Sequence, residues 1–311
     1  MVARARRGAD GRSTLCGLLR CPDCGAGIVI EAGSARCLGT AHSFAVVDGI
    51  PVLADEDLLG ADPQYALQRR YFDAEYARYG TYRLDNWRLS YLQRLRSTGI
   101  LGSKSTPLLD VGVGGSGYTV IEAARAGSLA IGCDLSLEAV LTARRFAATE
   151  GVADRTLWIC CSAERLPVAP ASVASAVAIA VIEHVPDHLG ALQEMARVLR
   201  PGGKAWITVP HALAHISPLF RLPNRLHDRR LGHLRRYEVE SLIEAGRSAG
   251  LNAERAQFTG HPVKVLQLAS AGVLRGQIGD RFWWWCEKRD LARSADRRGS
   301  MQLSVIFSRA E

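Results

Sequence analysis

The sequence contains no apolar run long enough to cross a membrane, and its beginning lacks the apolar core of a secretory signal. The longest apolar stretch, residues 173–182, is broken by Ser175 and falls well short of the roughly 20 residues that a membrane span needs. Residues 1–15 are rich in arginine, which favours a frayed basic tail over an export signal. Internal repeats are also absent. We therefore expect a cytoplasmic, globular protein.

Composition sets the size and class of the fold. The chain has 311 residues, of which 48% are apolar and 23% charged, so it can bury a core and is not disordered throughout. This length suits one large domain, alone or with a small companion. Eight cysteines in a chain of this size suit a reducing compartment and a metal site better than a disulfide framework.

Positive charge is concentrated toward the C-terminal end. Residues 221–311 carry 17 Lys and Arg against 10 Asp and Glu, which accounts for most of the net charge of +8. Residues 221–236 include six arginines and one acid, Asp228. Such a patch can attract phosphate, nucleic acid or an acidic metabolite, or it can be an ordinary solvated face. The sequence leaves both interpretations open.

A metal-ligand pattern lies near the N-terminus. Cys21 and Cys24 form a CxxC pair, twelve residues separate Cys24 from Cys37, and four more separate Cys37 from His42. Four such ligands suit tetrahedral zinc in a structural site. A module of some 50 residues buries too little surface to be stable alone, so a metal ion would supply the missing stability. The alternative is a reduced CxxC in an ordinary turn. We expect a small, strand-poor zinc module at residues 16–58.

Strand and helix patterns alternate through the rest of the chain. Residues 62–98 have apolar positions at helical spacing, with a break at Gly80. From residue 107 onward this alternation predicts an α/β fold with a doubly wound parallel sheet. The predicted strands are 107–113, 129–133, 158–161, 174–182, 204–209 and 301–308, and the predicted helices are 117–127, 135–149, 188–199 and 238–249.

A glycine-rich loop connects the first of these strands to its helix. Gly112, Gly114 and Gly117 permit a tight turn, so that a ligand can approach the backbone and the helix N-terminus. With Asp134 about 20 residues on, the spacing also fits a dinucleotide-binding fingerprint. Asp110 precedes the loop, where its carboxylate can meet a cationic amino group. On spacing alone, a nicotinamide-dependent enzyme stays open.

Two further segments, Ile182-Glu-His-Val-Pro-Asp187 and Arg197-Val-Leu-Arg-Pro-Gly-Gly203, complete a recognisable set. With the glycine loop, they make residues 107–210 resemble the class I S-adenosylmethionine-dependent methyltransferases that act on diverse small molecules. Agreement is looser at residues 232–237. The resemblance implies a Rossmann-like, doubly wound sheet of seven mostly parallel strands. It also implies methyl transfer from S-adenosylmethionine by in-line displacement.

The resemblance also implies a set of cofactor contacts. Asp110 and the glycine loop would hold the methionine part, and Asp134 the ribose, with Leu135 beside the adenine. Ser162 and Ala163 stand where the family commonly has an aspartate near the adenine amino group. The helices before residue 107 often cover the cofactor in this family, which makes Tyr71 and Tyr79 candidates. The expected cofactor-binding residues are Asp110, Gly112, Gly114, Gly117, Asp134, Leu135, Ser162, Ala163, Tyr71 and Tyr79.

Candidate bases follow the fourth and fifth strands of this pattern. Glu183 and His184 lie where the methyl group should emerge, and His211 follows the next strand. Each can instead pack or cap a turn. We keep all three as candidate catalytic residues.

The N-terminal module resembles the zinc ribbons of ribosomal RNA guanine-N1 methyltransferases and of methyltransferase-activator proteins. It leads to a division into a basic tail (1–15), a zinc ribbon (16–58), a helical lid (59–106) and a methyltransferase domain (107–311) with an insertion (261–299). We expect a small-molecule acceptor, such as a specialised metabolite or a lipid- or sugar-linked intermediate. An RNA acceptor and a non-catalytic activator subunit are the alternatives. Packing of Trp283–Trp285 is favoured over contact with a membrane surface.

Overall fold

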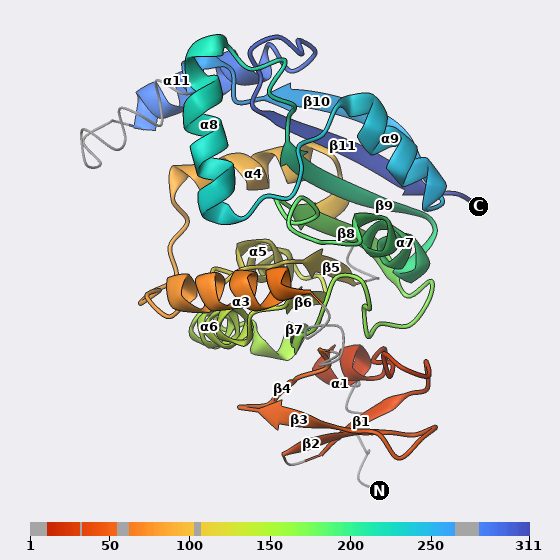
Figure 1. The fold of residues 1–311 in the computed structure, drawn as a ribbon. Helices are drawn as coiled ribbons and strands as arrows, with labels where there is room; N and C mark the ends of the chain where they lie inside the picture. The colour runs from red at the N-terminus through yellow and green to blue at the C-terminus, as the bar shows by residue number, and fades with distance from the viewer. Residues whose placement is uncertain (1–10, 32, 55–61, 103–106, 265–279) are drawn as a thin grey trace, which may run out of the picture.

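The computed structural model describes residues 11–31, 33–54, 62–102, 107–264 and 280–311, and two sheets organise this part of the chain (Figure 1). The larger sheet has the strand order β10-β11-β9-β8-β5-β6-β7, and β11 runs antiparallel to both of its neighbours. A doubly wound, mostly parallel sheet of seven strands is therefore confirmed. Its strands are β5 (Leu108–Val111), β6 (Ala130–Asp134), β7 (Thr156–Cys160), β8 (Val173–Ile179), β9 (Leu199–Pro210), β10 (Leu251–Thr259) and β11 (Gln302–Arg309).

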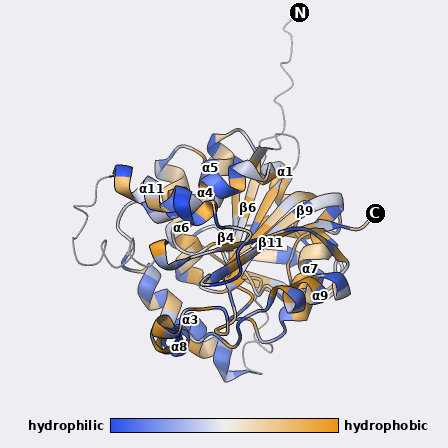
Figure 2. Cartoon of the chain, turned by 90° about the horizontal axis from the view of Figure 1, so that it is seen from above, coloured by the Kyte–Doolittle hydropathy of each residue, from blue (hydrophilic) through white to orange (hydrophobic). Residues whose placement is uncertain are grey.

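Helices cover both faces of this sheet and create two apolar cores. One core joins the sheet to α7 (His188–Val198) and α9 (Val239–Ser248). The other joins it to α4 (Asn86–Ser97), α5 (Tyr118–Arg125) and α6 (Leu137–Thr149). Figure 2 shows mainly hydrophobic strands at the centre and hydrophilic residues on the surrounding helices. Parallel strands need this cover because apolar side chains project from both of their faces.

Two helices that follow β9, and the strand β10, were not predicted. α8 (Pro218–Leu231) contains Pro223 and buries none of its residues, so its pattern gives no core-facing stripe. β10 alternates poorly because a register shift interrupts its pairing with β11 between Ala253 and Arg255. α11 (Asp280–Leu291) lies in the expected insertion. These elements all lie outside residues 107–210, which contain the sequence motifs.

Two helices precede the sheet, as the spacing at 62–98 predicts. α3 (Pro63–Tyr76) begins with Asp62 as its cap, whose carboxylate accepts from the Gln64 N–H at 2.8 Å. α4 is capped in the same manner by Asp85. The break falls between Tyr76 and Asn86 and includes Gly80. In Figure 1, α3 lies in front of β6 and beside α6.

The N-terminal module is a four-stranded antiparallel sheet, so the expectation of a strand-poor module is wrong. Its strands are held by backbone pairing, which turn-forming residues in the sequence obscured. Residues 11–16 form α1, which differs from a tail that extends to residue 15; residues 1–10 of that tail lie outside the described residues. The strands are β1 (Ile28–Glu31), β2 (Ser34–Cys37), β3 (Ser43–Val47) and β4 (Ile50–Pro51).

This module extends the larger sheet at its β7 edge. Val52, just after β4, pairs in parallel with Cys160, and the Leu53 N–H donates to the Cys160 carbonyl at 2.8 Å. Leu15, Leu19 and Leu53 are fully buried in the same core as the sheet. The module therefore protects the β7 edge, which would otherwise expose unpaired backbone groups.

Candidate active site

The glycine loop after β5 requires glycine at two positions, where φ is positive and an added Cβ would collide with a neighbouring side chain. Gly112, Gly114 and Gly117 all have positive φ, at 69°, 62° and 55°. A Cβ on Gly112 would lie only 2.4 Å from a methyl group of Val181, so both conformation and space exclude a side chain there. Gly117 caps the N-terminus of α5, where a Cβ would meet the Trp158 ring at 2.7 Å. Positive φ and the close approach of the Val181 and Trp158 side chains thus determine these two positions.

Asp134, the last residue of β6, fixes this loop to the second strand. One carboxylate oxygen accepts from the Gly114 N–H and the other from the Ser136 N–H, each at 2.9 Å. Burial raises the pKa of Asp134 to about 6, although these two N–H donors oppose the shift. The carboxylate ties the loop to the end of β6 and retains acceptor capacity for a ligand hydroxyl.

Asp110 lies below the loop on β5 and is buried. The Thr119 hydroxyl donates to its carboxylate. Burial raises the pKa of Asp110 well above its usual value, and the nearby Asp134 contributes in the same direction. A cationic ligand group would compensate both effects, which fits the role expected for this residue.

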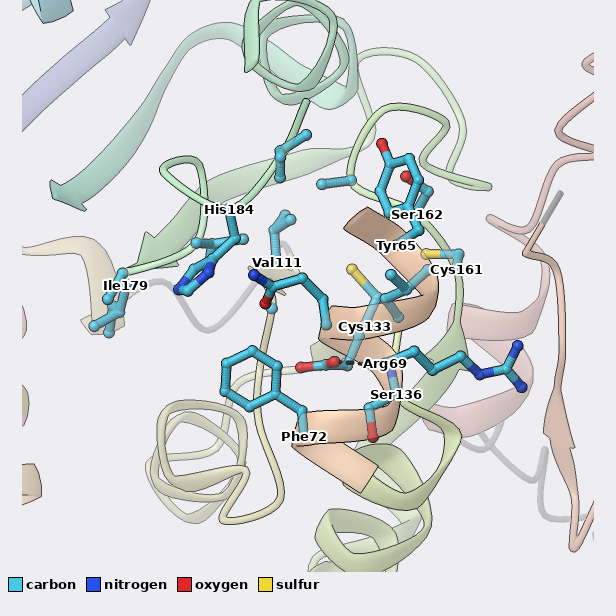
Figure 3. Close-up of a pocket in the computed structure, with 18 of the residues that line it drawn as sticks. Tyr65, Arg69, Phe72, Val111, Cys133, Ser136, Cys161, Ser162, Ile179 and His184 are labelled. Atoms are coloured by element: carbon cyan, nitrogen blue, oxygen red, sulfur yellow. Dashed lines mark hydrogen bonds between the residues drawn. The ribbon is translucent and has the colours of Figure 1, made fainter. Parts of the chain in front are cut away.

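A first cavity of about 160 Å³ lies against the ends of β5 and β6, and Figure 3 shows the side chains around it. Asp134, Leu135, Ser162 and Ala163 line it together, as expected for an adenosine site. The Ser162 hydroxyl accepts from the Glu164 N–H at 3.2 Å. Further lining residues are Tyr65, Gln68, Arg69, Phe72, Tyr76, Val111, Gly112, Cys133, Cys161, Val181 and His184.

α3 covers the first cavity with residues that sequence reasoning missed. Tyr65, Phe72 and Tyr76 line the cavity, whereas Tyr71 lines neither this cavity nor the second one described below. Tyr76 packs closely over the glycine loop, since a Cβ on Gly115 would lie 2.8 Å from its ring. Residues 65, 72 and 76 recur at helical spacing, and this periodicity could have identified the face.

A second cavity of about 560 Å³ adjoins the first, and Tyr76, Gly112, Ile179 and Ala180 line both. Asp110, Gly114 and Tyr79 line the second cavity, so the expected methionine contacts lie on this side. Its other walls come from elements distant in the sequence. They are Trp87, Arg88 and Tyr91 of α4, Tyr118 of α5, Asn224, His227 and Leu231 of α8, and Glu183, Arg236, Thr259, Lys264 and Gln302.

The cationic groups of the second cavity have partners within the protein. Arg236 donates to both carboxylate oxygens of Asp228, at 2.7 and 2.9 Å. The buried Lys264 ammonium contacts Glu287, and burial lowers the pKa of Lys264. Arg88 pairs with Asp85 at 2.5 Å. These charges shape the cavity without leaving a cation free among them.

Glu183, unlike these paired cations, has no partner for its carboxyl group in the part of the chain that the structure describes. It is fully buried at the wall of the second cavity, and neither carboxylate oxygen has a hydrogen-bond partner among the described residues. Burial raises the pKa of Glu183 to about 8. An unpartnered buried carboxyl is costly, so its presence beside a cavity suggests a role toward a ligand.

The two histidine candidates occupy different surroundings. His184 lines the first cavity, with its ring against Phe72 and against His233 at a centroid distance of 4.7 Å. Burial lowers its pKa to about 3. His211 is buried outside both cavities, and its Nδ1 lies 2.7 Å from the Ser300 hydroxyl. Burial lowers its pKa to about 4.

The cysteines of the N-terminal module gather as their spacing predicts. The sulfurs of Cys21, Cys24 and Cys37 all lie within 4.8 Å of one another. His42 Nδ1 is 3.8 Å from the Cys21 sulfur and 3.0 Å from a carboxylate oxygen of Asp23. Three thiols with an adjacent imidazole match the soft donors that zinc prefers.

Comparisons with known proteins agree with this geometry. A family model described as "Methyltransferase domain" matches residues 109–207. Over 176 residues the chain is 30% identical to a ubiquinone biosynthesis O-methyltransferase of Photorhabdus laumondii, covering 52% of this chain and 69% of that protein. It is also 36% identical over 104 residues to the tRNA 5-carboxymethoxyuridine methyltransferase of Escherichia coli K12, covering 33% of this chain but only 40% of that protein.

Among solved structures, the geranyl diphosphate C-methyltransferase of Streptomyces coelicolor is similar in fold. That structure is a complex with Mg²⁺, geranyl diphosphate and S-adenosyl-L-homocysteine. The alignment has a TM-score of 0.58 at 16% identity and covers 80% of this chain and 99% of that one.

Proposed function

Because the chain belongs to the class I S-adenosylmethionine-dependent methyltransferases, we propose that it transfers a methyl group from S-adenosylmethionine to a small-molecule acceptor. The acceptor classes we favour are a specialised metabolite and a lipid- or sugar-linked intermediate. The observation that carries the proposal is the pair of adjoining cavities, one lined by Asp134, Leu135, Ser162 and Ala163 and the other by an unpartnered buried carboxyl.

The residues present fit the cofactor. Asp134 retains acceptor capacity for ribose hydroxyls, and Leu135, Ser162 and Ala163 surround the space for adenine. Asp110, on the far side of Gly112, offers a buried carboxylate for the amino group of the methionine part. When bound, the cofactor supplies a methyl group activated by attachment to a positively charged sulfur.

Within the second cavity, Glu183 is the proton acceptor that the geometry favours. Its carboxylate can accept a hydrogen bond from a hydroxyl or amine and take the proton that this group loses on methylation. His184 lies on the cofactor side with a pKa of about 3, and His211 lies outside both cavities. We therefore favour an oxygen or nitrogen acceptor, whose proton Glu183 would take.

Calorimetry with purified protein tests the cofactor assignment directly. We expect S-adenosylhomocysteine to bind with a measurable heat and NAD⁺ to give none. Binding of NAD⁺ without S-adenosylhomocysteine would overturn the assignment and restore the nicotinamide alternative. A methylation assay on cell extracts would then separate an enzyme from a non-catalytic activator subunit.

An RNA acceptor is the second candidate, favoured by the 36% identity to the tRNA methyltransferase and by the arginines at 221–236. RNA binding through phosphates depends strongly on salt. We expect tRNA binding that is weak and no steeper in salt than for an unrelated basic protein. Tight binding with a steep salt dependence would make RNA the acceptor.

We also propose that Cys21, Cys24, Cys37 and His42 hold one structural zinc ion in the 16–58 module, and that α3 and α4 act as the lid within 59–106. The three sulfurs support the first part, although His42 groups with Asp23 as well as Cys21. Metal analysis should find about one zinc per chain. Absence of zinc from protein purified without chelators would overturn it.

A further inference from the structure

The outer face of α8 is apolar although nothing in the described structure covers it. Leu219, Leu222 and Leu226 are 76%, 64% and 56% exposed. Their spacing of three and four residues places them on one face of the helix. Scattered exposed leucines are ordinary, but a contiguous stripe of three on one helix marks a contact surface.

Arginines flank this stripe. Arg225, Arg229 and Arg230 are exposed and make no ion pair with the acids that the structure describes. The single acid of α8, Asp228, instead bonds to Arg236 and His233 on the protein side. The outer face therefore combines leucine with unpaired positive charge, and Figure 2 shows α8 at the periphery with both residue classes.

The inner face of the same helix belongs to the proposed active site. Asn224 and His227 line the second cavity. The C-terminal carbonyls of α8 accept from side chains of α3, since Gln68 Nε2 donates to Leu231 O at 3.1 Å and to Gly232 O at 2.8 Å. The helix is thus held on the protein by its inner face, with the acceptor cavity on one side and the leucine stripe on the other.

We propose that α8 docks in the plane of an anionic lipid bilayer, with Leu219, Leu222 and Leu226 among the acyl chains and the arginines on lipid phosphates. An apolar stripe bordered by arginine is the pattern of interfacial helices. Docking would bring the second cavity to the membrane surface. That last step rests on the proposed function and implies an acceptor with an apolar, membrane-held portion.

Charge argues against the other occupants of this face. A second copy of α8 packed on the stripe would bring two sets of unpaired arginines together without an acid between them. RNA would satisfy the arginines but leave three leucines against a polar backbone. A bilayer provides phosphates for the arginines and acyl chains for the leucines. The structure therefore favours a membrane contact, which the sequence analysis did not favour. The membrane contact weighed in the sequence analysis was at Trp283–Trp285, and Trp283 is buried.

Vesicle sedimentation of the full chain tests the proposal. Vesicles of phosphatidylcholine with about 30% phosphatidylglycerol should bind the protein at least about 10-fold more tightly than pure phosphatidylcholine, and added salt should weaken binding. Leu222→Ser/Leu226→Ser and, separately, Arg225→Glu/Arg229→Glu should each lower binding about 10-fold. The matched control is Leu189→Ser/Arg247→Glu on α7 and α9, an exposed leucine and arginine on other helices, and should stay within about twofold.

S-adenosylhomocysteine binding by each variant checks that it is folded. Failure of the wild-type protein to bind either vesicle would overturn the proposal, as would equal binding by the control and the α8 variants. Dimerisation lost in the leucine variant, without vesicle binding, would assign the stripe to a second copy. Tighter binding to tRNA than to anionic vesicles would assign it to RNA. Vesicle binding that persists while cofactor binding fails would retain the docking surface and overturn the proposed function instead.

Discussion

The two cavities differ in the parts of the protein that form their walls. The first lies where β5 and β6 end, and its wall includes Gly112 at positive φ and Asp134, whose carboxylate accepts from the Gly114 and Ser136 N–H groups. The second is formed by side chains from α4, α8 and the segment near Lys264. A backbone-built site can hold one cofactor across many proteins, whereas a side-chain-built site is free to change its ligand. This difference explains why fold and family inform the cofactor far better than the acceptor.

The largest expected effect is on turnover, when the proposed proton acceptor of the second cavity is removed. Glu183→Gln should lower turnover by about 10²–10³-fold, since positioned general bases contribute of that order. S-adenosylhomocysteine affinity should stay within about twofold, because the substitution keeps the size of the side chain and the proposed cofactor contacts are Asp110 and Asp134 rather than Glu183. Steady-state kinetics and calorimetry measure the two quantities. Loss of turnover in His184→Asn with normal Glu183→Gln would transfer the role to His184.

The pH dependence sharpens the same assignment. Glu183 has a folded-state pKa of about 8, so wild-type turnover should rise as pH increases through 8 and Glu183→Gln should lose this rise. Because the folded-state pKa is raised, the stability contribution is fully present below the unfolded pKa and is lost as pH rises toward and through 8. Glu183→Gln should therefore melt at a higher temperature than wild type at pH 9. An unchanged melting temperature would contradict the burial of an ionising carboxyl.

A second substitution tests the backbone-built cavity. Gly112→Ala should lower S-adenosylhomocysteine affinity at least about 100-fold and destabilise the fold, because its Cβ would collide with Val181. Gly250→Ala is the matched control, since Gly250 has φ +84° and no neighbour within 4 Å of an added Cβ. The control carries only the left-handed penalty of about 1–2 kcal/mol. Equal affinities for the two variants would show that space at Gly112 is irrelevant.

The N-terminal module, for which we propose a zinc ion, offers an intermediate effect on cofactor binding. Cys24→Ser should lose the metal and lower cofactor affinity about 10-fold, because the module pairs with Cys160, two residues before Ser162. Cys286→Ala, outside the module, should keep both. Metal analysis and calorimetry provide the measurements. Zinc loss with unchanged affinity would restrict the metal to local stability of the module.

The same contrast governs what the sequence could predict. The order of strands and helices from β5 through β9, and the convergence of Asp110, Gly112 and Asp134, follow from apolar periodicity and glycine spacing, which are local properties. α8 and β10 were not predicted, because α8 buries none of its residues and burial does not alternate along β10. The second cavity escaped because its walls meet only after folding, and no local pattern relates Trp87 to Asn224 or Lys264.

The smallest effect concerns the boundary between the cavities, where Tyr76 rather than the sequence candidate Tyr71 lies on the covering face of α3. Tyr76 contacts the glycine loop and lines both cavities, whereas Tyr71 lines neither. Tyr76→Ala should lower S-adenosylhomocysteine affinity about 5-fold through lost aromatic packing. Tyr71→Ala, on the same helix, should change it by less than about twofold. Calorimetry on both variants decides the matter: a larger effect at Tyr71 would mean that α3 rotates when the cofactor binds, and the two cavities would then not be separate in the working protein.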